Sequence, residues 1–178
     1  PKVSRANRDP FVTLVRTIIS QNTADTNTER AFEQLSKRFE ICSEILSKAK
    51  LSQIEGCLNV AGLYRNKART IKNVSKLIQD EFDGDLGQLM KLPTEEARKR
   101  FMRFPGVGPK TADVVLLFSG RRGVIPVDTH VNRVSKRLGL VCDGMHYEQV
   151  SKSLQSLYSV KDYLAVHLLL ITHGRKYC

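Results

Sequence analysis

The chain has 178 residues, of which 41% are hydrophobic and 26% are charged, a balance that supports a folded core and excludes a disordered chain. No stretch approaches the ~20 apolar residues that a membrane-spanning helix needs, and residues 1–5 form no apolar leader. With 29 Lys and Arg against 18 Asp and Glu, the formal net charge is +11, which favours nucleic acid over a membrane surface as the partner.

The four cysteines, Cys42, Cys57, Cys142 and Cys178, are widely spaced along the chain. None forms a C-x-x-C pair or has the spacing of a zinc site. Scattered thiols are more typical of an intracellular chain than of a secreted disulfide framework. The sequence therefore predicts free thiols, and it predicts that the first three are small buried residues.

Apolar residues recur at helical spacing from residue 10 onward. Asp9 and Pro10 have the pattern of an N-cap followed by proline at the first helical position. The first helix and the next have these residues on their apolar faces: Phe11, Leu14, Val15 and Ile18, then Thr28, Phe32, Leu35 and Phe39. Ser52, with Glu55 three residues later, has the pattern of a capping box. These signals predict a succession of short helices.

The middle of the chain continues the helical pattern. The next apolar face consists of Ala68, Ile71, Val74, Ile78 and Phe82. A turn at residues 83–85 is expected to end this helix. Thr94 is expected to cap the following helix, which has acidic residues in its first turn and basic residues toward its end, as the helix dipole favours.

The last part of the chain is also helical in pattern. Residues 145–158 and 160–173 each have helical spacing, and Gly174 is expected to stop the second helix. The only β-like run, residues 124–127, is short and contains Pro126. The whole pattern predicts an all-α fold of about ten short helices.

The most informative segment reads FMRFPGVGPKTADVVLLF. One helix is expected to end before Phe104 and another to begin at Pro109, with Gly106, Val107 and Gly108 in the turn. Glycines beside a helix N-terminus expose N–H groups that bind phosphate without reading base sequence. A tight turn between two helices also favours Gly and Pro. The net charge of the chain makes phosphate binding the stronger interpretation.

This segment resembles the helix-hairpin-helix of the endonuclease III superfamily of DNA glycosylases. Five segments carry the resemblance in order: SQNT at 20–23, GLYRNKA at 62–68, the hairpin at 101–118, GRRGVIPVDTHV at 120–131 and HGRKYC at 173–178. The resemblance implies an all-α, two-lobed helix-hairpin-helix DNA glycosylase fold with a DNA groove between the lobes. It places a six-helix barrel at residues 9–122 and a second helical lobe at residues 1–8 and 123–178.

Lys110 lies in the first turn of the second hairpin helix. The residues alone leave two interpretations equal: an amine that attacks C1′ of a damaged nucleotide, and a lysine that only contacts phosphate. The positive end of the helix dipole and the loss of water on nucleotide binding would both favour the neutral amine that attack requires. The resemblance assigns Lys110 as the nucleophile that forms a Schiff base, because bifunctional members carry lysine at this place.

Asp128 precedes the helical pattern of Val131, Val134 and Leu138. Its carboxylate fits an N-cap, and a capping Asp is also fixed in orientation, which suits proton transfer. The resemblance implies that Asp128 assists Lys110 and helps to abstract the proton for β-elimination.

An enzyme that acts on a base in duplex DNA must take the base out of the stack. The resemblance places gap-filling residues at Asn22, Leu63 and His130, and the adjacent Gln21 could share this role. Relatives often have Gln at the position of Asn22, so the contacts with the opposite base stay open. Asp25, near the same loop, either lines the pocket or caps a helix.

The iron–sulfur region departs from the family pattern. Cys178 matches only the first of four closely spaced cluster ligands, and one thiolate cannot hold a [4Fe–4S] cluster. Cys42, Cys57 and Cys142 match no ligand position. We therefore expect no metal or cofactor in this sequence, and a cluster only if the native chain continues past Cys178.

The resemblance implies a base-excision-repair DNA glycosylase with AP-lyase activity that acts inside the cell on double-stranded DNA. Its expected substrates are oxidised pyrimidines and abasic sites, and the protein is expected to be a monomer without a membrane partner. One alternative is a glycosylase of another specificity, for mismatched thymine or an oxidised purine. The other is a helix-hairpin-helix module that binds DNA structure without catalysis.

Overall fold

The computed structural model describes residues 9–178, which form ten α-helices and two short 3-10 helices. In chain order they are α1 Pro10–Ser20, α2 Asp25–Arg38, α3 Ser43–Lys48, α4 Leu51–Leu58, α5 Tyr64–Phe82, η2 Leu86–Lys91, α6 Thr94–Phe101, α7 Pro109–Gly120, α8 Thr129–Arg137, α9 Tyr147–Leu157, η3 Val160–Asp162 and α10 Tyr163–Lys176. No strand forms among these residues, and the β-like run at 124–127 is a buried irregular connection. The all-α prediction is confirmed.

Over this same range, no helix combines the length and the apolar character needed to cross a membrane.

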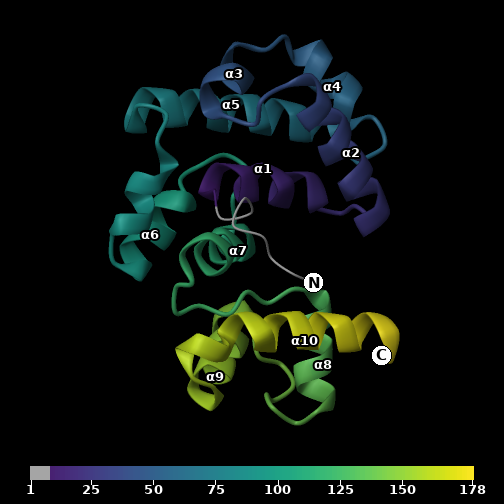
Figure 1. Ribbon diagram of the computed structural model, residues 1–178. Helices are drawn as coiled ribbons and strands as arrows, with labels where there is room; N and C mark the ends of the chain where they lie inside the picture. The colour runs from purple at the N-terminus through teal and green to yellow at the C-terminus, as the bar shows by residue number, and fades with distance from the viewer. Residues whose placement is uncertain (1–8) are drawn as a thin grey trace.

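The helices gather into two lobes, α1–α7 above and α8–α10 below in the view of Figure 1. α1 runs through the middle of the larger lobe and packs on α2, α5 and α7. Its Leu14, Ile18 and Ile19 are almost completely buried there. In the smaller lobe α10 packs against α8. The two-lobed architecture is confirmed. The division at residues 122 and 123 stays a prediction, and residues 1–8 lie outside the described part of the chain.

Local signals place several helix ends where the sequence predicts them. Asp9 caps α1, since its Oδ1 accepts a hydrogen bond of 2.7 Å from the N–H of Phe11, an interaction that contributes about 1 kcal/mol. α5 ends at Phe82, and Asp83 then adopts a left-handed conformation with φ of 49°. The helix-hairpin-helix follows the prediction as well, with α6 ending at Phe101 and α7 beginning at Pro109.

Two expected caps are wrong. α4 begins at Leu51, so Ser52 already lies inside its first turn, and α6 begins at Thr94 itself. A side chain inside the first turn cannot reach the free N–H groups as an N-cap side chain does. The acidic first turn and basic last turn of α6 are present as expected.

Gly174 does not stop α10, which continues to Lys176. A Cβ at Gly174 would lie 3.0 Å from Cβ of His130 and 3.0 Å from a methyl group of Val134. The glycine is therefore a packing residue, because it lets α10 approach α8 more closely than a larger residue would allow.

The cysteines are all free thiols, but their burial differs from the expectation. Cys57 is buried and Cys42 is half-buried. Cys142 is exposed, so the prediction that it is buried is wrong. Cys142 lies in the connection between α8 and α9, outside the apolar face of either helix.

Replacing Gly174 with Ala should lower the free energy of unfolding by about 1 kcal/mol, because overpacking outweighs the gain in helix propensity. Gly56 is the matched control: it is also helical, and a Cβ there would meet nothing within 4 Å. Gly56→Ala should raise the free energy of unfolding by about 0.5–1 kcal/mol. Urea unfolding of both variants tests this, and stabilisation by both would show that the α8–α10 contact is loose.

Candidate active site and DNA-binding surface

The hairpin between α6 and α7 presents free backbone N–H groups at the start of α7. No side chain caps this helix. Gly106 has φ of 70°, and a Cβ there would lie 2.9 Å from a methyl group of Thr70 on α5. The side chain of Val107 is buried and its N–H donates to Phe104 O at 3.1 Å, so Val107 fixes the turn. The exposed Gly108 and the first turn of α7 form the anion-binding end.

Gln21 joins the loop after α1 to the hairpin. Its side-chain amide donates to Gly106 O at 3.0 Å and to Thr111 Oγ1 at 3.2 Å. In the free protein this side chain therefore positions the hairpin instead of projecting into solvent. The neighbouring Asn22 is exposed.

The structure brings the loops of Asn22 and Leu63 together on the larger lobe. Asn22 has φ of 50° and Leu63 has φ of 57°, and such left-handed backbone costs on the order of 1–3 kcal/mol for a residue other than glycine. Leu63 is 62% exposed despite its apolar side chain. A Cβ on Gly62 would lie 3.0 Å from Asn22 O, so the two loops touch. Exposed side chains on a constrained backbone are suited to insertion into a base stack.

Lys110 and Asp128 line one cavity of about 600 Å³ where the two lobes meet. Lys110 comes from the first turn of α7, and Asp128 is the N-cap of α8, accepting a 2.7 Å hydrogen bond from Val131 N. His130 also lines this cavity, and its Nδ1 lies 3.1 Å from the guanidinium of Arg133. The predicted catalytic pair thus shares a cavity, although it comes from different lobes.

His167 lines the same cavity and is a residue that sequence reasoning missed. Its Nδ1 lies 3.0 Å from Pro126 O, and since a carbonyl can only accept, Nδ1 carries the proton. Burial lowers the pKa of His167, opposed by the nearby charge of Asp128. His167 therefore ties α10 to the loop that carries Asp128.

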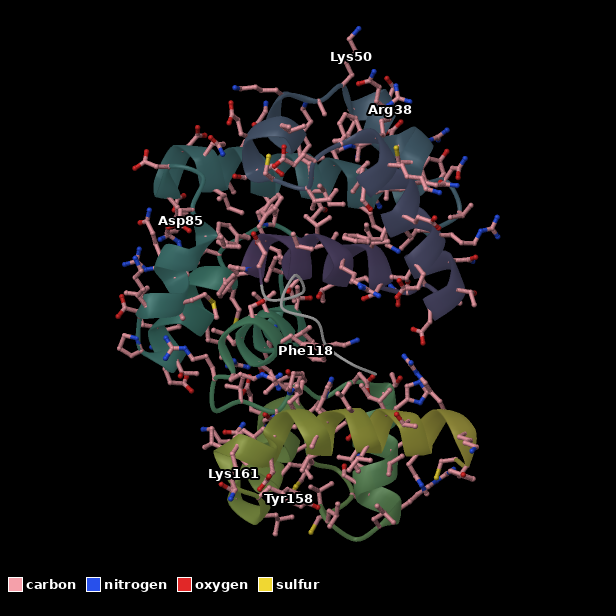
Figure 2. The ribbon with its side chains drawn as sticks, in the orientation of Figure 1. Arg38, Lys50, Asp85, Phe118, Tyr158 and Lys161 are labelled. Atoms are coloured by element: carbon pink, nitrogen blue, oxygen red, sulfur yellow. The ribbon has the colours of Figure 1, made fainter. Side chains whose placement is uncertain are left out.

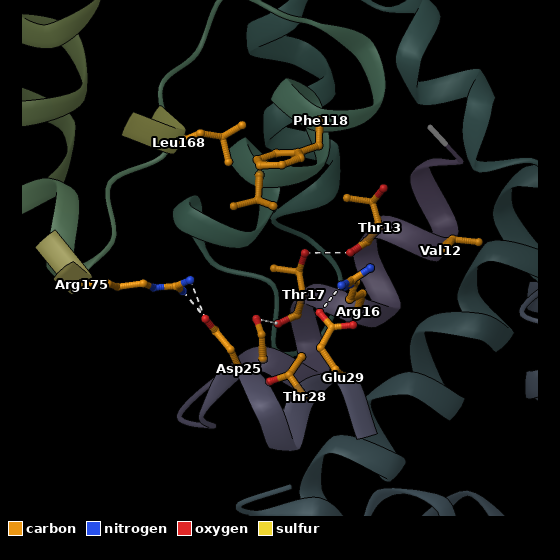
Figure 3. Close-up of a pocket in the computed structure, with 12 residues that line it drawn as sticks. Val12, Thr13, Arg16, Thr17, Asp25, Thr28, Glu29, Phe118, Leu168 and Arg175 are labelled. Atoms are coloured by element: carbon orange, nitrogen blue, oxygen red, sulfur yellow. Dashed lines mark hydrogen bonds and ion pairs between the residues drawn. The ribbon is translucent and has the colours of Figure 1, made fainter. Parts of the chain in front are cut away.

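A second cavity, of about 340 Å³, adjoins the first and shares Phe118 and Arg175 with it (Figure 3). It has apolar walls from Phe118, Leu168 and neighbouring residues, and polar walls from α1. Arg175 of α10 forms a bidentate ion pair with Asp25 of α2. Asp25 lines both cavities, which agrees with one of its two predicted roles; the other role, as a helix cap, is wrong because Ala24 is the N-cap of α2. Figure 2 shows Phe118 at the level where the lobes meet.

A buried polar network connects the hairpin with the loop of Asp128. Asp113, three residues after Lys110, accepts hydrogen bonds from Arg98 Nε at 2.6 Å and Tyr147 Oη at 2.8 Å. Tyr147 Oη in turn accepts from Val127 N at 3.4 Å. Burial raises the pKa of Asp113, and the hydrogen bonds of Arg98 and Tyr147 oppose that rise. No local sequence signal marks these residues, because the contacts join four distant segments.

The cysteines do not fit a [4Fe–4S] cluster. No group of three or more His, Cys, Asp or Glu side chains able to hold a metal ion occurs between residues 9 and 178. Cys57 is part of the hydrophobic core of the larger lobe.

Residues 15–159 match the model of the HhH-GPD superfamily of base excision DNA repair proteins. Endonuclease III of Sulfolobus acidocaldarius is 38% identical over 172 residues, covering 96% of this chain and 75% of the relative. The chain belongs to the endonuclease III family within this superfamily. Endonuclease III of Thermotoga maritima is 32% identical, again covering 96% of this chain and 75% of the relative. A trapped covalent intermediate of an endonuclease III with DNA is similar in structure, with a TM-score of 0.84, 31% identity and coverage of 96% and 76% of the two chains.

Membership in the endonuclease III family makes this chain a DNA glycosylase of base excision repair, with DNA as its partner. Asn22, at the tip of one of the touching loops, and Lys110, in the first turn of α7, both line the cavity where the lobes meet. The family fold therefore fits the prediction of a DNA groove at this junction.

The hairpin glycines allow a test of phosphate binding separate from stability. Gly108→Ala should lower the free energy of unfolding by no more than about 1 kcal/mol, because a Cβ there meets nothing within 4 Å and only the poorer N-cap propensity of Ala counts against it. The added methyl group would stand between the hairpin N–H groups and phosphate, so affinity for duplex DNA should fall about tenfold. Fluorescence anisotropy measures the affinity. Gly106→Ala is the contrast, since it should lower both affinity and stability. Unchanged affinity of Gly108→Ala would exclude the hairpin as a phosphate contact.

Proposed function

We propose that this endonuclease III family member is a bifunctional glycosylase that removes oxidised pyrimidines and cleaves abasic sites, with Lys110 as nucleophile and Asp128 as its acid/base partner. The observation that carries the proposal is that Lys110 and Asp128 line one cavity at the junction of the lobes. A covalent endonuclease III–DNA intermediate of similar structure supports a covalent route for this chain as well.

The first step exchanges one bond at C1′ for another. The neutral amine of Lys110 forms a bond to C1′ while the glycosidic bond breaks, and the damaged base leaves with the electron pair and takes up a proton. Asp128 accepts a proton from the attacking amine and stabilises positive charge at C1′. Opening of the sugar ring then gives the Schiff base.

Strand cleavage follows from the Schiff base. Asp128 takes the proton from C2′, and the C–H electron pair turns the iminium into an enamine. Return of that electron pair forms the C2′–C3′ double bond and restores the iminium, while the bond from C3′ to its phosphate oxygen breaks and the phosphate leaves with the bonding pair. Asp128 is fixed by its hydrogen bond from Val131 N, so one carboxylate oxygen is held by the cap and the other can face the sugar. Hydrolysis of the product Schiff base returns Lys110 to its free form.

The adjoining 340 Å³ cavity would receive the extruded base. Its apolar wall at Phe118 and Leu168 suits the face of a base, and Asp25 with Arg175 supplies an acceptor and donors for the base edge. All groups invoked come from one chain, so we propose that a monomer suffices. We expect the enzyme to act where genomic DNA is held, the nucleoid of a prokaryote or the nucleus of a eukaryote.

Borohydride trapping tests the role of Lys110. The wild type should form a covalent product with duplexes that contain thymine glycol or an abasic site, and Lys110→Ala should form none while still binding abasic DNA. Lys50→Ala, at the outer end of the larger lobe (Figure 2), is the control and should trap normally. Duplexes with 8-oxoguanine or a T·G mismatch test the alternative specificities. A wild type that binds all these duplexes and traps on none would contradict the Schiff-base route and favour a binding module.

Asp128 allows capping and catalysis to be separated, because Asn caps a helix about as well as Asp. Asp128→Asn should therefore keep the free energy of unfolding within about 0.5 kcal/mol while lowering the single-turnover rate of excision by about 100-fold or more. Asp128→Ala should lower the single-turnover rate of excision to a similar extent, and it should also lower the free energy of unfolding by about 1 kcal/mol. If Asp128→Asn keeps nearly the wild-type rate, the carboxylate serves only as a cap.

A further inference from the structure

Lys67 is a buried lysine in the first turn of α5, with 4% of its surface exposed. The positive end of its own helix dipole disfavours a cation there. Burial lowers the pKa of its amine. No carboxylate between residues 9 and 178 forms an ion pair with it. A buried cation without a carboxylate partner is unfavourable unless other groups satisfy its three donors.

The side chain of Lys67 finds its acceptors in the loop after α1. Its Nζ donates to Ile19 O at 2.7 Å and to the hydroxyl of Thr23. Ile19 lies in the last turn of α1, where free carbonyl groups and the negative end of the helix dipole favour a cation. The two acceptors lie on either side of Asn22 in the chain, so the ammonium closes the loop that carries Asn22.

The second loop leads directly into the helix that carries Lys67. The N–H of Lys67 donates to Leu63 O at 3.1 Å as a regular hydrogen bond at the start of α5, so the left-handed Leu63 lies one turn before Lys67. Gly62 directly contacts the carbonyl group of Asn22. The ammonium of Lys67 therefore binds the first loop to the start of α5, the helix that the second loop enters, and each loop has an exposed left-handed residue at its tip.

We propose that Lys67 is a positioning residue for base extrusion, which ties the loops of Asn22 and Leu63 into one rigid wedge. This inference rests on the proposed function and on the gap-filling role that the family resemblance implies for these two residues. A wedge that is already ordered loses less conformational entropy when it enters the stack than two independent loops would. Without the ammonium, Ile19 O and the Thr23 hydroxyl lose their donor, and each loop must be ordered by the DNA itself.

The test compares Lys67→Met with the matched control Lys72→Met. Lys72 is on the same helix, and its ammonium also donates to a backbone carbonyl, that of Ala49. Single-turnover excision of thymine glycol is measured in duplex DNA and in the same strand without its complement. Lys67→Met should slow excision from the duplex about tenfold, since small misplacement of a positioning group has effects of this size. Its rate on the single strand, which has no gap to fill, should stay within about twofold of wild type, as should both rates of Lys72→Met.

Thr23→Val removes one acceptor of Lys67 at nearly constant volume, and it should lower the duplex rate in the same direction by a smaller factor. It keeps the inference testable if Lys67→Met does not fold. Equal slowing on duplex and single strand would overturn the inference, because it would indicate a general structural role. An unchanged duplex rate in a folded Lys67→Met would overturn it as well.

A fluorescence measurement tests the role of Lys67 in wedge insertion independently of the catalytic role proposed for Lys110. In a Lys110→Ala background, 2-aminopurine is placed opposite a stable abasic analogue, and wedge insertion should unstack it and raise its emission. Adding Lys67→Met should reduce this rise, whereas adding Lys72→Met should not. An equal rise with and without Lys67→Met would count against the wedge. A wild type that excises from neither substrate would refute the proposed chemistry while this measurement still tests Lys67.

Discussion

The buried ion pair of Arg98 and Asp113 is the interaction on which the geometry of the site depends. The side chains of Asp113 and Arg98 are 2% and 13% exposed, and Asp113 also accepts a hydrogen bond from Tyr147. Removing one member of such a pair would leave a buried charge uncompensated, at a cost of about 3–5 kcal/mol. The pair joins α6 to α7, while Tyr147 reaches the backbone of Val127. The same contacts therefore fix the hairpin, the start of α7 and the loop of Asp128.

The loops of Asn22 and Leu63 and the hairpin are ordered by polar contacts that an apolar core could not supply. Gln21 attaches the loop after α1 to the hairpin at Gly106, and Lys67 attaches the same loop to the start of α5. Each contact satisfies a backbone carbonyl group that would otherwise lack a donor. Strained positions such as Asn22 and Leu63 persist only when the surrounding structure determines them from several directions. Phosphate contacts and gap filling can thus occur on one rigid surface.

Much of the fold could be predicted from the sequence because it depends on interactions between residues that are close together in the chain. The cap at Asp9, the end of α5 and the hairpin each depend on residues within a few positions of one another. Gly174 misled because glycine both ends helices and permits close packing, and only the distant α8 decides between these roles. The resemblance identified Lys110 and Asp128 as candidate catalytic residues, but it did not point to His167 or Lys67 as residues of the site. His167 contacts Pro126, 41 positions away in the chain, and Lys67 contacts Ile19, 48 positions away. The spacing of residues within a helix or loop does not predict contacts between such distant segments.

The division of the chemistry between the lobes has a consequence for catalysis. Lys110 belongs to a helix that packs on α1, whereas Asp128 caps a helix that packs on α10. The proposed nucleophile and its proposed partner therefore stay at a fixed separation only while the lobes keep their relative placement. Three contacts join the segments concerned: Tyr147 with Asp113, His167 with Pro126, and Arg175 with Asp25. The part-buried hydrogen bond of Tyr147 joins the smaller lobe to α7, whereas the buried one of His167 fixes the Asp128 loop within the smaller lobe. The ion pair of Arg175 and Asp25 is half-exposed and crosses the junction beside the cavity, so water screens it, and it is the contact that an incoming base can most easily replace.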